Sequence, residues 1–137
     1  MDIKKLSIGT IAGAVVFFLL GWLVYGMLLQ DFMRHHLGNV GIIGRKEIKF
    51  TFLIAGYVLQ GLLLTYILLK ANVNSLAGGL VTGAVVGFLM AAALDLIMYG
   101  TSTILSKNGM MADVIAATAI SAIAGAVVGA LIGEKKQ

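Results

Sequence analysis

The sequence predicts an all-α integral membrane protein, a four-transmembrane-helix bundle in which neighbouring helices run antiparallel. Hydrophobic residues make up 60% of the 137 residues and charged residues only 12%, whereas soluble domains are about half apolar and about a quarter charged. A helix needs about 20 apolar residues to cross a bilayer core about 30 Å thick. Four stretches meet this length, and they are residues 7–29, 48–69, 77–98 and 113–133. A third span that runs on to Leu105 is an alternative.

The first apolar stretch is interpreted as a retained span and not as a secretory signal. Its apolar run continues as far as Leu29, and no small-x-small cleavage site follows it. Residues 70–76 form a short polar connection, which predicts that the second and third spans are antiparallel neighbours. We therefore expect residues 1–137 to form a single membrane domain with both termini on the same side of the bilayer.

The basic residues lie beside the predicted spans. The net charge is +4, but lysine and arginine at span ends meet lipid headgroups and set the topology. We therefore expect membrane lipids as partners and no nucleic acid. Five basic residues fall on the side of the termini and five on the other side, so their distribution predicts no orientation. The first connection carries the candidate residues for headgroup contact, which are Arg34, His35, His36, Arg45 and Lys46.

Small residues recur at every fourth position in the last two spans. The stripe in the third span is Gly79, Gly83, Gly87 and Ala91, and the stripe in the fourth span is Ser121, Gly125, Gly129 and Gly133. Steps of four stay on one face of a helix, and small residues there let two backbones approach closely. We expect the two stripes to pack antiparallel, with Gly79 on Gly133, Gly83 on Gly129 and Gly87 on Gly125. Contact between copies of the chain through the same stripes is an alternative.

Asp95 continues the stripe of the third span and is the only acid in that span. The expected pairing places it near Ala117, facing protein and not lipid. Acids inside membranes commonly mark ion or proton pathways, so Asp95 is a candidate carrier of a proton or cation, with Arg34 or Lys107 balancing its charge. The alternative is an interfacial acid that hydrogen-bonds to helix ends.

Further polar residues complete the candidate ion, proton or polar site. Odd-numbered spans end on one side of the membrane, which gathers Asp113 and Tyr99 near Asp95. Gln60 lies near the middle of the second span, where an amide usually holds helices together and less often lines a cavity. The tyrosines at span ends, together with Trp22, are typical of the aromatic belts at membrane interfaces, and they are Tyr25, Tyr66 and Tyr99.

No motif in the chain predicts catalysis. A nucleophile elbow, a phosphate loop and an HExxH zinc motif are all missing, and the chain has no cysteine. Asp31 and His35 have the spacing of two metal ligands on one helix face, but contact with headgroups is favoured for this segment. We therefore expect no enzymatic activity, no cofactor and no metal.

Three stretches together resemble an uncharacterised family of small four-span bacterial membrane proteins, a domain of unknown function. These stretches are "GWLVYGMLLQDFM", "GGLVTGAVVGFLMAAALDLIMYG" and "DVIAATAISAIAGAVVGALIG". The resemblance implies a location in the bacterial cytoplasmic (inner) membrane and no particular activity. The glycine stripes and the lack of catalytic motifs favour a small non-enzymatic membrane protein that acts through assembly with itself, with lipid or with a partner complex. The alternative is a proton- or cation-coupled small transporter or channel that uses Asp95.

Overall fold

The computed structural model describes residues 1–36, 38 and 47–133, and it is all-helical over this part of the chain. Its helices are α1 (Ile3–Leu23), the π-helix η1 (Val24–Leu28), α2 (Gln30–His35), α3 (Phe50–Lys70), α4 (Leu76–Thr101) and α5 (Lys107–Ile132). Four segments are long and apolar enough to cross a membrane, namely α1 with η1, α3, α4 and α5. The predicted fold class is confirmed.

The last two spans extend beyond the apolar stretches that predicted them. The α4 helix continues to Thr101, and α5 begins at Lys107 and not near Asp113. Ser106 caps α5, since its side-chain oxygen accepts a hydrogen bond from the N–H of Gly109 at 3.1 Å. The first turn of α5 is polar, so hydropathy alone assigned it to a loop. The connection between the two helices is therefore a short turn.

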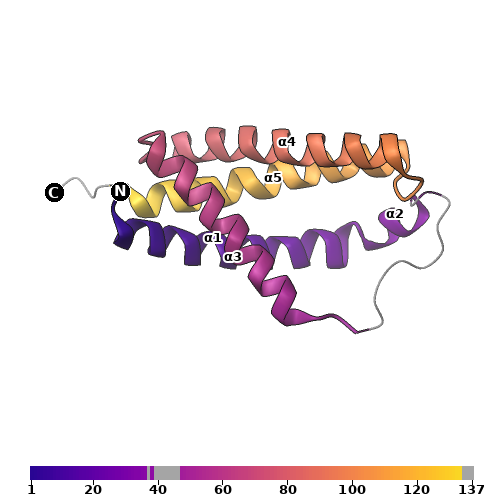
Figure 1. The fold of residues 1–137 in the computed structure, drawn as a ribbon, viewed down its shortest axis with the longest axis horizontal. Helices are drawn as coiled ribbons and strands as arrows, with labels where there is room; N and C mark the ends of the chain where they lie inside the picture. Colours follow the sequence, from indigo (N-terminus) through magenta and orange to yellow (C-terminus); the bar gives the residue numbers. More distant parts are fainter. Residues whose placement is uncertain (37, 39–46, 134–137) are drawn as a thin grey trace.

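The α5 helix lies in the middle of the molecule, with α4 along one side and α1 along the other (Figure 1). The α3 helix crosses α1 diagonally and reaches α5 near its own C-terminal end. This crossing limits the predicted contact between the second and third spans, because α3 diverges from α4 beyond the turn that joins them. The hydrophobic core lies between α1, α3 and α5 and consists of Phe17, Leu64, Leu68, Ile120, Ala124, Val128 and Ile132.

The glycines of α4 and α5 form a continuous seam where the two backbones touch. A Cβ atom added to Gly83 would lie 3.0 Å from the Cα of Gly125 and against the carbonyl oxygen of Ser121. A Cβ atom on Gly129 would lie 3.0 Å from the Cα of Gly79. These separations leave no room for a side chain, so glycine is what permits the close contact.

The predicted pairs along this seam are wrong by one step of the stripe. Gly83 was expected on Gly129 but lies against Gly125, and Asp95 was expected near Ala117 but faces Asp113. The reason is the short turn. The midpoint of the observed pair Gly83 and Gly125 is residue 104, whereas the expected pair has its midpoint at residue 106. In an antiparallel pair, moving the turn by two residues moves every partner by four.

The other predicted seam contacts shift in the same direction. A Cβ atom on Gly79 would meet Gly125 and Gly129, and one on Gly87 would meet Ser121 and Ala117. Gly133 does not contact Gly79, and a Cβ atom there would meet the backbone of Asn74 in the turn before α4.

Backbone hydrogen bonds tie the turn after α4 to the chain that follows α2. The N–H of Gly38 donates to the carbonyl oxygen of Ile104 at 2.9 Å, and the N–H of Ser106 donates to that of His36 at 3.3 Å. The Ser106 hydroxyl also donates to the His36 carbonyl oxygen. These bonds hold the turn at residue 104 and thereby fix the partners along the seam.

Candidate functional site

Three of the four predicted polar-site residues line one cavity between α3, α4 and α5. This acidic cavity has a volume of about 240 Å³ and receives Gln60 from α3, Asp95 from α4 and Asp113 from α5. Its remaining lining residues are Phe17, Leu63, Leu64, Val86, Gly87, Met90, Ala91, Leu94, Ala117 and Ser121. The cavity is thus a mostly apolar space with two carboxyl groups, one amide and one hydroxyl at its surface.

Asp95 is the most deeply buried acid at this site. Its side chain is only 7% exposed, and Oδ2 has no hydrogen-bond partner among the described residues. The residue lies six positions before the last residue of α4, which places it about 9 Å along the helix axis from that end. Burying an acid with an unpartnered oxygen costs free energy, so this position is not explained by stability.

The group that faces Asp95 across the seam is a second acid. Asp113 lies six positions after the first residue of α5, and the observed register brings the two carboxyl groups together. Arg34 and Lys107 were predicted to balance the charge of Asp95, yet both are exposed, and the charged neighbour of Asp95 is Asp113. Two neighbouring carboxylates repel each other, so the pair favours the binding of a proton or another cation.

Tyr25 is a site residue that the sequence analysis assigned to the aromatic belt. Its hydroxyl donates a hydrogen bond of 3.4 Å to the backbone carbonyl oxygen of Asp113, and the side chain is half-buried. Tyr25 belongs to η1, and π-helical turns in membrane and soluble helices often lie at functional sites. The only feature of the sequence that pointed to this contact is that Tyr25 and Asp113 fall at the same end of the predicted bundle.

The remaining predicted site residues lie outside the acidic cavity. Tyr99 is 46% exposed and does not line it. Arg34 and His35 are exposed, as headgroup contacts require, whereas His36 is half-buried and its ring stacks on Phe32 at 4.0 Å. The His35 ring bonds to the backbone carbonyl of Asp31 at 2.6 Å, not to its carboxyl group. Arg45 and Lys46 lie outside the described residues.

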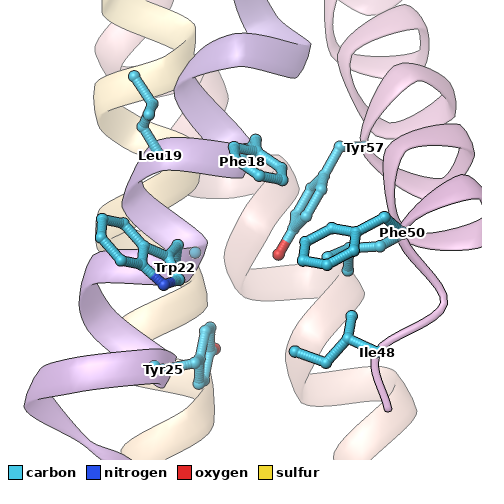
Figure 2. Close-up of a pocket in the computed structure, with 10 residues that line it drawn as sticks. Phe18, Leu19, Trp22, Tyr25, Ile48, Phe50 and Tyr57 are labelled. Atoms are coloured by element: carbon cyan, nitrogen blue, oxygen red, sulfur yellow. The ribbon is translucent and has the colours of Figure 1, made fainter.

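A second and larger cavity lies between α1 with η1 and the start of α3. This aromatic groove has a volume of about 590 Å³, and aromatic side chains from both segments line it (Figure 2). Phe18 meets Tyr57 edge to face, with ring centres 5.9 Å apart. Tyr25 lines this groove, and its hydroxyl also reaches the backbone of Asp113, which lines the acidic cavity.

Within the residues that the structure describes, no three histidine, cysteine, aspartate or glutamate side chains gather as metal ligands. Comparisons with protein families, curated proteins and solved structures give no match. The resemblance to a family of small four-span bacterial membrane proteins therefore stays a prediction.

Proposed function

We propose that this protein is a small cation-coupled transporter or channel whose coupling site is the carboxyl pair of Asp95 and Asp113. The observation that carries the proposal is Asp95 itself, which is 93% buried, has an unpartnered oxygen and faces a second acid in a cavity of the bundle. An ionisable residue inside a membrane helix costs free energy, and such residues commonly mark ion or proton pathways.

The energetics of the pair supports cation binding. A charged residue costs about 2.5–3.5 kcal/mol at the centre of a membrane helix on insertion scales, and less near the helix ends. A bound proton or cation would remove the repulsion between the two acids and supply a partner for Oδ2 of Asp95. Among the described residues, the other polar groups beside the pair are neutral, and they are the Tyr25 hydroxyl of η1, the Gln60 amide of α3 and the Ser121 hydroxyl of α5.

The experiment is a flux measurement with purified protein in liposomes. We expect the wild type to carry protons or a small cation along an imposed gradient, and Asp95→Asn to reduce the initial rate at least tenfold. The matched control is Asp31→Asn, which removes an exposed acid of α2. Wild-type flux in the Asp95→Asn protein, or no flux of any tested cation through the wild type, would contradict the proposal.

A second candidate is a non-enzymatic protein that acts by assembly with lipid, with a copy of itself or with a larger membrane complex. The aromatic groove supports it, because a groove of about 590 Å³ is open along the outer face of α1 and α3. The glycine stripes do not add to this candidate, since α4 and α5 use them on each other.

Native mass spectrometry of the protein released gently from its own membrane tests this candidate. A defined oligomer or a retained lipid or protein supports assembly, whereas a bare monomer contradicts it. For either candidate we propose a location in the bacterial cytoplasmic membrane, with both termini on the same side.

A further inference from the structure

We infer that the acidic cavity takes a small organic cation, an ammonium group with apolar substituents, and that this ligand enters sideways between α3 and α4. The inference rests on the proposed function and names the class of ligand for the same site. It follows from two features of the cavity, the composition of its wall and the position of its opening.

The wall of the cavity is unsuited to a bare metal ion. Calcium takes six to eight oxygen ligands, and magnesium requires near-octahedral coordination with oxygen or water. The cavity offers the carboxyl groups of Asp95 and Asp113, the Gln60 amide and the Ser121 hydroxyl, spread over three helices. All its other lining residues are apolar or glycine, so a metal ion that lost its water there would have to draw every side-chain ligand from these four residues at once.

The same wall fits an alkylammonium ion. Its positive charge needs one anionic partner, which the carboxyl group of Asp95 at the wall of the cavity can supply. Its substituents need apolar contacts, which Phe17, Leu64 and Met90 can give. A ligand pocket is commonly built this way, with mostly apolar walls and a few polar groups that fix the orientation.

A cleft adjoins the cavity and lies along α3, with Met90 of α4 on its other side. This cleft has a volume of about 540 Å³ and shares Gln60, Leu63 and Met90 with the acidic cavity. It exists because α3 crosses the molecule diagonally and leaves α4 beyond their common turn (Figure 1). The opening lies on the outer face of two membrane-spanning helices, so a cation with apolar substituents could reach Asp95 from the lipid phase.

Binding of tetraethylammonium tests the inference. The full chain is placed in nanodiscs of phosphatidylethanolamine and phosphatidylglycerol, and binding is measured by isothermal titration calorimetry at constant ionic strength. We expect saturable binding that Asp95→Asn weakens at least tenfold and that neither potassium nor magnesium displaces at equal concentration. Binding that is unchanged in Asp95→Asn, or displaced equally well by either metal ion, would overturn the inference.

A variant of the apolar wall separates this inference from the proposed function. Met90→Gln places an amide where the cavity meets the cleft, and we expect it to weaken tetraethylammonium binding at least fivefold. Met27→Gln, at an exposed methionine of η1, is the matched control and should bind as the wild type does. Asp95-dependent proton flux without tetraethylammonium binding would overturn the inference and leave the proposed function standing. If the wild type shows neither tetraethylammonium binding nor cation flux, both the inference and the proposed function are overturned.

Discussion

Asp95 combines burial, an unpartnered oxygen and a like-charged neighbour, and each of these disfavours the folded state. We therefore predict that Asp95→Asn raises the free energy of unfolding by about 1–3 kcal/mol, because the amide keeps the shape of the side chain and removes the charge. The measurement is unfolding of the purified protein in mixed micelles by a denaturing detergent. Asp31→Asn, which removes an exposed acid, should leave the stability unchanged.

The opposite result for Asp95→Asn would be informative. A loss of stability would mean that the carboxylate holds the helices together, and the site would then be structural. A gain in stability together with a loss of flux is the pattern of a residue kept for function at the expense of stability.

The sequence predicted Asp95, Asp113 and Gln60 as polar-site residues, and the fold brings all three to one cavity. Asp95 could be predicted because it continues the periodic stripe of small residues. Tyr25 could not, because its contact with Asp113 depends on the π-helical turn at residues 24–28, and no periodicity in the sequence encodes that turn.

At the scale of the helices, the glycines of α4 differ sharply in what a methyl group would meet. We predict that Gly83→Ala lowers the free energy of unfolding by about 1–3 kcal/mol, because its Cβ atom would overlap the Ser121 carbonyl oxygen and force the helices apart. Gly100→Ala on the same helix is the matched control, since nothing lies within 4 Å of its added Cβ atom. It should be neutral or stabilising by up to about 1 kcal/mol. Equal changes in the free energy of unfolding for Gly83→Ala and Gly100→Ala would contradict the close contact of α4 with α5.

The register of the seam can be measured by disulfide cross-linking, since the chain has no cysteine of its own. The observed pairing places Ala91 beside Ala117, whereas the pairing expected from the sequence placed it beside Ser121. We predict that the double variant Ala91→Cys with Ala117→Cys cross-links under mild oxidation in membranes. Ala91→Cys with Ser121→Cys should cross-link much more slowly, because about one helical turn separates these positions. Faster cross-linking of Ala91→Cys with Ser121→Cys would contradict the observed register and support the one expected from the sequence.

This register explains why the sequence predicted the helix pair but not its partners. Stripes that repeat every four residues fit one another equally well after a shift of four, so the pattern alone cannot choose among registers. The choice is made by the turn at residue 104 and by its backbone bonds to His36 and Gly38. These hydrogen bonds join main-chain atoms of segments that are distant in the sequence. Every residue type has such atoms, so the sequence does not predict the bonds.

At the scale of the whole molecule, the fold class followed from composition and span length, whereas the path of α3 did not. Its close crossing with α1 needs Gly61, where an added Cβ atom would lie 2.6 Å from the carbonyl oxygen of Thr10. Across this crossing, α1 places Gly9, Gly13 and Gly21 against α3, but α3 contributes only Gly61 as a glycine in return. The sequence of α3 therefore shows no stripe comparable to those of α4 and α5. The cleft beside the acidic cavity results from this crossing, so the shape of the candidate site was beyond prediction from sequence.

The two ends of the molecule carry balanced positive charge, which makes orientation in the membrane sensitive to a single lysine. The end with the N-terminus carries Lys4, Lys5 and Lys70 among its basic residues, and the opposite end carries Lys107. Orientation follows the side with more lysine and arginine in short connections. We predict that Lys107→Gln increases the fraction of molecules with both termini in the cytoplasm. We predict that Lys70→Gln decreases that fraction.

A reporter fused to the C-terminus measures this in a bacterial inner membrane, with fluorescent protein active only in the cytoplasm and alkaline phosphatase active only outside it. The ratio of the two activities should change in opposite directions for the two variants. The same ratio in both variants and in the wild type would mean that a feature other than the charge balance fixes the orientation. A single orientation in the cell would then place the acidic pair, which lies near the end opposite the termini, on one defined side of the membrane.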